Sequence, residues 1–306
     1  MAPCSTSILL NSAPIPLLAP VTMAIFEFRF IVMDVFCILI HLIYEYYKKM
    51  SNIDSLNTEK FLFLDVGNSA VKAVYRQKGK WTSVHHKGKG HATDLIEWIK
   101  SHIRDFEAIV MSSVRKEIGN AFEEELQEVE CITLSVGDIP DEMLDYATPE
   151  TLGIDRFLAC YGAVALTSKS AVVIDAGTAC TIDFISADEV FRGGVIAPGF
   201  SAFNALLSKR APVLPFIESD TLIPEVWPGK STIASLAWGQ AGFYRDAIMA
   251  ALKRYEEEYD SFDVFITGGD ARKIESLLGM QGRIRPFLVF KGMERMMQLS
   301  TSVNGD

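Results

Sequence analysis

The sequence predicts an α/β fold of two related domains that face each other across a cleft, and three observations support this. The chain has 306 residues, enough for two ordinary domains. Hydrophobic residues make up 49% and charged residues 22%, the balance of a soluble globular protein with a substantial core. A strand-and-turn segment that begins at Phe61, FLFLDVGNSAVKAVY, returns at Ala171 as AVVIDAGTACTIDFI. An internal repeat of this kind indicates two copies of one folding unit.

The first copy begins a regular series of elements. Apolar runs bounded by Gly-containing turns indicate strands, and apolar residues at helical spacing indicate helices. The expected elements are strands at 61–66, 70–76 and 81–86, a helix at 92–104, a strand at 108–114, a helix at 116–127 and a strand at 131–135.

The second copy repeats this order. The expected elements are strands at 171–177, 179–186 and 189–198, a helical region, a strand at 263–269, a helix at 271–279 and a short strand at 286–290. An apolar helix at 152–166 connects the copies, and a Pro and an acid at 149–150 are typical of a helix entrance. We therefore expect a first domain at 60–156 and a second at 157–300.

The N-terminal residues 1–59 are expected to be an extension outside this fold. The apolar stretch 31–44 is interrupted by Asp34 and His41 and is shorter than the roughly 20 residues that a bilayer-spanning helix needs. A signal peptide would have an early basic residue and a small-residue cleavage site after its apolar run, and neither is present. These features favour Met50 as the initiating residue, with an interfacial helix as the alternative.

Charge and cysteine content exclude several classes of function. A formal net charge of −10 argues against general binding to nucleic acid or to anionic membranes, because such binding needs basic surfaces. The five cysteines are scattered and odd in number, so they predict neither a disulfide framework nor a zinc site. A reduced, cytoplasmic protein is the expected class.

The repeated turn carries the first functional signal. When the copies are aligned, Asp65 falls on Asp175, Gly67 on Gly177, and Asn68 on Thr178. One such turn is often purely structural, since Asp, Gly and Asn suit tight turns. Two copies, each ending the first strand of a repeated domain, favour a phosphate site in which backbone N–H groups hold phosphate oxygens. A carboxylate there can hold a hydrated metal ion, and Lys72 adds positive charge.

A second signal lies between the copies, in TLGIDRFLACYGA. Asp155 and Arg156 stand inside an otherwise apolar helix. An Asp–Arg pair on a solvated helix face is the structural interpretation. Because this helix leads from the first domain into the second, we expect the pair to point into the cleft instead. A carboxylate in that position can accept a proton from the hydroxyl group of a phosphate acceptor.

Three further motifs are weaker. PGKST at 228–232 resembles a P-loop, but Pro224 occupies the required upstream Gly position and no strand precedes it, so that interpretation fails. The segment GGVIAPG at 193–199 is either a structural strand exit or a close backbone approach to a ligand. ITGGDA ends a strand, and Asp270 there is either a helix cap or part of a loop that contacts a nucleotide.

Taken in order, DVGNS, TLGIDR, DAGTACTID, GGVIAPG and TGGD closely resemble the type III pantothenate kinase family, which belongs to the superfamily of acetate and sugar kinases, heat-shock chaperones and actin. The resemblance covers residues 61 to about 298, and Ser231 departs from it where many members have Asn. It implies two actin-like (ribonuclease H-like) domains, each a mixed five-stranded sheet with flanking helices, and an ATP cleft between them. It also implies a homodimer with its substrate site near the subunit interface.

The resemblance further implies ATP-dependent phosphorylation of pantothenate to 4′-phosphopantothenate, the first step of coenzyme A biosynthesis. Asp155 would be the general base, and Asp175 would hold a monovalent cation, K⁺ or NH₄⁺, while Mg²⁺ would accompany ATP. The residues implied to contact ATP are Asp65, Val66, Gly67, Asn68, Ser69, Ala70, Val71, Lys72 and Thr178. Those implied to contact pantothenate are Tyr146, Gly153, Ile154, Asp155, Arg156 and Thr232.

Other functions are compatible with the same fold. An accessory regulator would bind ATP without turnover, because a fold alone does not fix function. A pure binding protein has no need of a base, so Asp155 together with both turn aspartates favours an enzyme. A chaperone-like or actin-like scaffold would need large insertions that this chain lacks. A sugar or acetate as the phosphate acceptor is disfavoured only through the resemblance of TLGIDR.

Overall fold

The computed structural model describes residues 58–84, 91–215, 217, 223–259 and 261–302. The predictions for the N-terminal extension, including a start at Met50, concern residues outside these ranges. Within the described part of the chain, no helix is both long and apolar enough to cross a bilayer.

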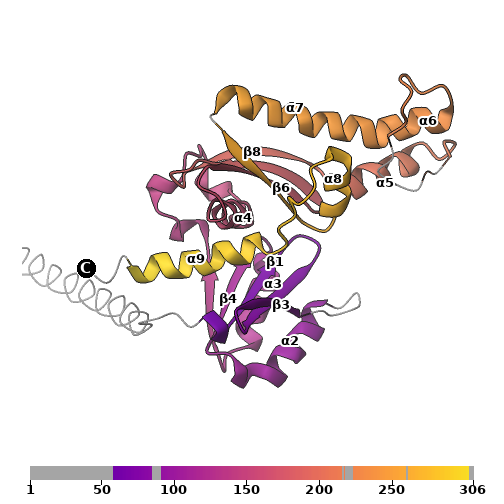
Figure 1. The fold of residues 1–306 in the computed structure, drawn as a ribbon. Coiled ribbons are helices and arrows are strands. Elements are labelled where there is room, and N and C mark those ends of the chain that lie inside the picture. The colour runs from indigo at the N-terminus through magenta and orange to yellow at the C-terminus, as the bar shows by residue number, and fades with distance from the viewer. Residues whose placement is uncertain (1–57, 85–90, 216, 218–222, 260, 303–306) are drawn as a thin grey trace, which may run out of the picture. The chain divides into compact units, whose positions relative to one another are not determined.

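The first copy of the repeat forms one mixed sheet. Its strands lie in the order β3-β2-β1-β4-β5, with β1 antiparallel to β2 and parallel to β4. Helices α2 and α3 cover one face (Figure 1). The elements are β1 (Phe61–Val66), β2 (Val71–Gln77), β3 (Lys80–Val84), α2 (His91–His102), β4 (Ala108–Ser113), α3 (Lys116–Glu125) and β5 (Glu130–Leu134).

The second copy forms a sheet with the same core pattern. Its strands lie in the order β8-β7-β6-β9, with β6 antiparallel to β7 and parallel to β9. The elements are α4 (Ile154–Val164), β6 (Ser170–Ala176), β7 (Ala179–Ile185), β8 (Phe191–Pro198), α5 (Phe200–Arg210), α6 (Thr232–Ala237), α7 (Phe243–Glu258), β9 (Phe262–Thr267), α8 (Ala271–Leu278) and α9 (Leu288–Ser302).

Each sheet is buried on both faces, which explains the nearly continuous apolar runs of the central strands. In the first sheet, Leu62 and Leu64 pack with Ile99 of α2 and Phe122 of α3. In the second, side chains of β6, β7 and β9 pack with α7 and α8, in a cluster that contains Val172, Ile174, Ile248, Leu252, Ile266 and Ile274.

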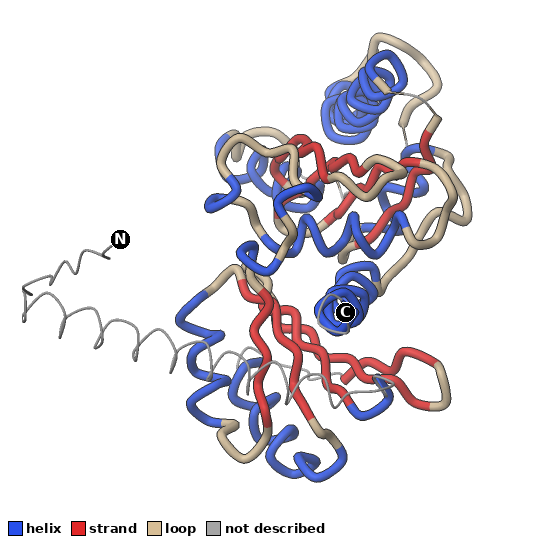
Figure 2. Tube along the Cα trace, turned by 90° about the vertical axis from the view of Figure 1, so that its left-hand side faces the viewer, coloured by secondary structure: helices blue, strands red, loops and turns tan. Residues whose placement is uncertain are grey.

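Helices α4 and α9 lie between the two sheets, where α4 contacts strands of both halves and α9 contacts β1 and β4 of the first sheet (Figures 1 and 2). They approach each other closely at two glycines. A Cβ atom on Gly162 would lie 2.1 Å from the carbonyl oxygen of Leu288, and one on Gly292 would lie 2.0 Å from that of Leu158. Such contacts exclude any larger side chain, so both positions require glycine.

One predicted element is wrong. The apolar segment expected as a strand at 286–290 forms a turn at 286–287 and the start of α9 from Leu288, so the second sheet has four strands among the described residues and not five. A short apolar run does not distinguish a strand from a buried helix. Here the helix buries Val289, Met293 and Met296, which recur at helical spacing on one face. Other predicted elements differ from the structure by a few residues at their ends.

Candidate active site

The two repeated turns open onto one cleft of about 1100 Å³, which has lining residues from both halves of the chain. Each turn follows the strand at the centre of its sheet. The N–H of Gly67 donates to the carbonyl of Ala70, and the N–H of Gly177 donates to that of Ala179, both at 3.0 Å. These bonds close the turns locally and leave the small residues between them at the surface of the cleft.

Most of the predicted site residues are brought together here. Those that line the cleft are Asp65, Gly67, Asn68, Ser69, Ala70, Lys72, Tyr146, Gly153, Asp155, Arg156, Asp175 and Thr178. Val66, Val71, Ile154 and Thr232 do not line it. Val66 and Ile154 are buried in the core, Val71 is half-buried against it, and Thr232 is exposed at the start of α6.

Asp65 is the most buried carboxylate of the cleft, with 7% of its surface exposed. The strand register places Lys72 on β2 and Ser112 on β4 on either side of it. The ammonium of Lys72 lies 3.8 Å from one carboxylate oxygen, and the Ser112 hydroxyl donates to the other at 3.5 Å. Burial nevertheless raises the pKa of Asp65 to about 6, with Lys72 lowering it and the negative charges of Asp155 and Asp175 raising it.

Asp175 holds the equivalent place in the second sheet, where it pairs in register with Thr181 and Thr267. Burial raises the pKa of Asp175 to about 6 as well, opposed by Lys72 and reinforced by Asp155 and Asp183. Gly268 makes room for this side chain. Its φ of +93° suits glycine, and a Cβ there would lie 2.5 Å from a carboxylate oxygen of Asp175.

Asp155 lies in the first turn of α4, where the helix dipole and free N–H groups favour negative charge. Its carboxylate accepts a hydrogen bond from the backbone N–H of Arg156 at 3.0 Å. Burial raises the pKa of Asp155 above its ordinary value, although the backbone hydrogen bond and the positive charge of Arg156 lower it. The residue before the helix is Gly153, and a Cβ there would lie 2.6 Å from the same carboxylate. Glycine at that position therefore leaves the Asp155 carboxylate room to face the cleft.

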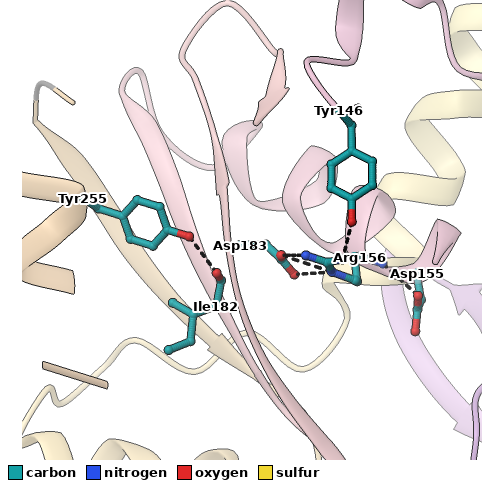
Figure 3. Close-up of polar contacts among 6 residues, drawn as sticks. All are labelled: Tyr146, Asp155, Arg156, Ile182, Asp183 and Tyr255. Atoms are coloured by element: carbon teal, nitrogen blue, oxygen red, sulfur yellow. Dashed lines mark hydrogen bonds and ion pairs between the residues drawn. The ribbon is translucent and has the colours of Figure 1, made fainter. Parts of the chain in front are cut away.

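Arg156 does not form a solvated pair with Asp155. Its guanidinium is buried against Asp183 of β7, with Nη2 2.5 Å from Oδ1 (Figure 3). The hydroxyl of Tyr146 accepts a weaker bond from Nη1 at 3.4 Å. Burial by itself would lower the pKa of the guanidinium, but the hydrogen bonds and charge of Asp183 hold it above its ordinary value. Arg156 therefore stays protonated.

The two turns also contact each other, because the Thr178 hydroxyl donates to that of Ser69 at 2.8 Å. This hydrogen bond joins the two halves of the cleft at the mouth of both turns. Both side chains are exposed, so each hydroxyl group is accessible to a ligand in the cleft.

Asp270 lines the cleft with Gly269, but its side chain does not cap the helix that it precedes. The carboxylate accepts the backbone N–H of Ser201 at 3.1 Å and lies 3.0 Å from the ammonium of Lys273. It thus ties the start of α5 to the loop after β9, which neither sequence interpretation of Asp270 predicted.

The PGKST segment is a helix start, in agreement with the rejection of the P-loop. Ser231 precedes α6, and its hydroxyl accepts the backbone N–H of Ala234 at 3.2 Å. Asp183 is the main residue that sequence reasoning missed. It ends the motif DAGTACTID as a charged residue between the apolar Ile182 and Phe184, a pattern that signals a buried partner without identifying it.

Comparison with known proteins gives a consistent result. The sequence profile of a family described as type III pantothenate kinase matches residues 61–254. A type III pantothenate kinase from Phocaeicola vulgatus is 30% identical over 244 residues, which cover 77% of this chain and 97% of that protein.

Similarity to solved structures is lower. A ROK family protein from Streptococcus pneumoniae in complex with sucrose has a TM-score of 0.45 at 11% identity, covering 79% of this chain and 99% of that one. The ethanolamine utilization protein EutJ from Carboxydothermus hydrogenoformans has a TM-score of 0.42 at 13% identity, covering 76% and 88%.

Proposed function

This chain belongs to the type III pantothenate kinase family, and on that premise we propose that it transfers the γ-phosphoryl group of ATP to the 4′-hydroxyl of pantothenate. The observation that carries the proposal is the cleft itself, in which the two repeated turns meet the carboxylates of Asp65, Asp155 and Asp175. Phosphoryl transfer requires mainly positioning and charge neutralisation, and a cleft of this composition supplies both.

In this proposal the first turn, from Asp65 to Lys72, binds the phosphates of ATP. Its small residues allow phosphate oxygens to approach the backbone N–H groups of Asn68 and Ser69. Lys72 contributes a positive charge to the same turn. Thr178 of the facing turn contacts the nucleotide from the opposite half, in place of its hydrogen bond to Ser69.

Asp155 is the proposed general base. It lines the cleft at the N-terminus of α4, and burial raises its pKa, which makes it a better proton acceptor than an exposed aspartate. Arg156 and Tyr146 lie beside it and would contact the acceptor molecule. The hydroxyl proton of pantothenate passes to the Asp155 carboxylate as the oxygen attacks the γ-phosphorus, and the bond from that phosphorus to the bridging oxygen of ADP breaks, so that ADP leaves.

The carboxylates of the cleft match the cations that the family resemblance implies. Asp65, Asp155 and Asp175 repel one another, and each has a pKa raised chiefly by burial, so bound cations would relieve an existing cost. No group of three His, Cys, Asp or Glu side chains among the described residues is arranged as a metal cage. Mg²⁺ commonly arrives with phosphates and binds through one or two carboxylates, so Asp65 would hold the Mg²⁺ of ATP and Asp175 a K⁺ or NH₄⁺ ion. Bound cations would neutralise phosphate charge.

We also propose a homodimer, with Thr232 acting in the cleft of the partner. Thr232 does not line the cleft of its own chain. Six exposed apolar side chains lie on α5, α6 and α7 and in the segment between α5 and α6: Leu206, Val213, Val226, Trp227, Ile233 and Phe243. Large apolar side chains that gather on an exposed face are typical of interfaces, and we propose that these side chains form the dimer contact. The cytoplasmic location is still a prediction from cysteine content.

The test of the activity is ADP release by the full chain with ATP, Mg²⁺ and pantothenate, first in K⁺ and then in Na⁺ alone. Turnover that requires both pantothenate and K⁺ is expected. ATP binding without pantothenate-dependent turnover would contradict the proposal and favour the regulator. For the dimer, light scattering of Phe243→Glu should show a monomer with weaker pantothenate binding, whereas an unchanged mass would place the interface elsewhere.

A further inference from the structure

The guanidinium of Arg156 is held from one side by Asp183. Nε lies 3.1 Å from Oδ1 and 3.2 Å from Oδ2, and Nη2 lies 2.5 Å from Oδ1. Only 8% of the arginine side chain and 2% of the aspartate side chain are exposed. A buried fork of this type fixes the plane of the guanidinium as well as its position.

The neighbouring strand is built around this pair. Asp183 pairs in register with Gly194 of β8, where a Cβ atom would lie 2.4 Å from its Oδ1 atom. Gly193 has a φ of +82°, and a Cβ there would lie 3.2 Å from the ring of Tyr146. The register shifts immediately afterwards, between Asp183 and Ile185. Irregularities of this kind often direct a side chain at a functional site.

The bonding pattern leaves two N–H groups of the guanidinium for a ligand. An arginine has five N–H groups. Asp183 accepts from the Nε N–H and from one N–H of Nη2, and the Tyr146 hydroxyl accepts from one N–H of Nη1. One N–H on Nη1 and one on Nη2 are therefore left without a hydrogen bond among those described. Arg156 lines the cleft, as does Asp155. Two donors on adjacent nitrogens of one guanidinium suit a carboxylate or a pair of acceptor oxygens.

We propose that Asp183 is a positioning residue, which holds the Arg156 guanidinium so that its two remaining N–H groups bind acceptor oxygens of pantothenate. This inference rests on the proposed function. Asp183 also balances the charge of Arg156, so the arginine contributes directed hydrogen bonds beside Asp155 without adding a net charge. A purely structural pair would behave differently, because its loss would change stability without selecting one substrate.

A double-mutant cycle tests the proposal, with Asp183→Asn, Arg156→Gln and the combination. Asp183→Asn should raise the KM for pantothenate about tenfold and leave the KM for ATP within about twofold, the scale of one misplaced charge-assisted hydrogen bond. In the Arg156→Gln background, Asp183→Asn should raise the KM for pantothenate by less than about twofold more. A residue that acts through Arg156 has nothing left to position once the arginine is gone. Additive losses, or an unchanged KM for pantothenate, would overturn the proposal.

Two controls separate an effect on folding from an effect on substrate binding. Asp183→Asn leaves a buried cation without its partner and is expected to lower the Tm, whereas the double variant removes both charges and should recover part of it. Glu294→Gln is the matched control, because it breaks a buried pair with Arg76 at 2.8 Å, and neither residue lines the cleft. If Glu294→Gln raises the KM for pantothenate as much as Asp183→Asn, general destabilisation explains the effect and the proposal is wrong.

A structural readout separates this inference from the proposed function. Crystal structures of the wild type and of Asp183→Asn should show the Arg156 guanidinium displaced in the variant, whatever the acceptor molecule is. A guanidinium in the same place in both structures would refute the positioning role. If instead the wild type shows no pantothenate-dependent ADP release, the proposed function fails, and acceptor binding by Arg156 fails with it. The crystal structures would still decide whether Asp183 orients Arg156.

Discussion

The turns after β1 and β6 repeat the same aspartate and glycine in different electrostatic surroundings. In the first turn, register places the ammonium-bearing Lys72 opposite Asp65, and in the second it places Thr181 opposite Asp175. The first carboxylate therefore has a cation from its own chain at 3.8 Å, whereas a hydroxyl-bearing residue takes that place beside the second. In the proposed function the two turns therefore have different tasks, and Asp175 would hold a cation from solution.

The largest expected effect concerns a carboxylate that belongs to neither turn. Asp155→Asn should lower kcat by about two to four orders of magnitude while the affinity for ATP is unchanged, since it removes the proposed base and leaves both turns intact. The loss can fall at the small end of that range because the transition state is loose. Rapid-quench kinetics and nucleotide titration measure the two quantities. Unchanged turnover would remove Asp155 from the base role.

The second prediction tests whether the two turns respond to different cations. Asp65→Asn should lower kcat/KM about a hundredfold and raise the Mg²⁺ concentration needed, while Asp175→Asn should give a similar loss and a weaker response to K⁺. Titration of each cation against each variant gives four curves. If both variants alter the Mg²⁺ curve and neither alters the K⁺ curve, the two turns share one task and the proposed division between them is incorrect.

The third prediction concerns stability and pH. The folded-state pKa of Asp175, about 6, lies above its ordinary 3.8, so the folded protein binds this proton more tightly and ionisation above pH 6 destabilises the fold. Asp175→Asn should therefore raise the free energy of unfolding by about 1–3 kcal/mol at pH 8 without K⁺. The gain should shrink as pH falls through 6 and vanish near pH 4. Urea unfolding at several pH values measures it.

A control of opposite sign is available in Asp263, which accepts a hydrogen bond from the Thr167 hydroxyl at 2.5 Å. That bond lowers the pKa of Asp263, so its ionised form stabilises the fold above its unfolded pKa, and the stabilisation is lost as pH falls through the lower folded value. Asp263→Asn should therefore destabilise the protein at pH 8. If both variants shift stability in the same direction, the electrostatic explanation fails.

The smallest effect is expected where the two turns meet. Ser69→Ala removes the hydroxyl that accepts from Thr178 at 2.8 Å, an exposed hydrogen bond worth about 0.5–1 kcal/mol. Thermal unfolding should show that loss without ATP, and the difference between variant and wild type should shrink when ATP is bound, since the nucleotide replaces the contact in both. A loss that is equal with and without ATP would show that the nucleotide leaves this hydrogen bond intact.

The turns themselves were predictable because they repeat. An Asp and a Gly at the end of an apolar strand, found twice, located both halves of the cleft from the sequence. The connecting helix was also expected, although it begins at Ile154 and follows a separate short helical turn at Pro149–Thr151. These features are local, and local sequence carries turn and helix signals well.

The contacts that the sequence did not reveal join distant segments. Asp183 pairs with Arg156 across 27 positions, and Asp270 holds the start of α5 across 69. A single sequence gives the polar residue but not its partner, because pairing depends on strand register and on room left by residues such as Gly194. The start of α9 was mistaken for a strand for a related reason, since its burial depends on contacts with α4.

Helix α9 has a consequence for the order in which the protein can fold during synthesis. It follows β1 by most of the chain, yet it packs with α4 against the first sheet, and Phe290 lies 6.4 Å from Trp81 of β3. Domains generally fold as they leave the ribosome, N-terminal part first. During synthesis, one apolar face of the first sheet therefore stays without its α9 contacts until α9 has been made. A ribosome that stalls before Leu288 would therefore release a nascent chain prone to aggregation and dependent on chaperones.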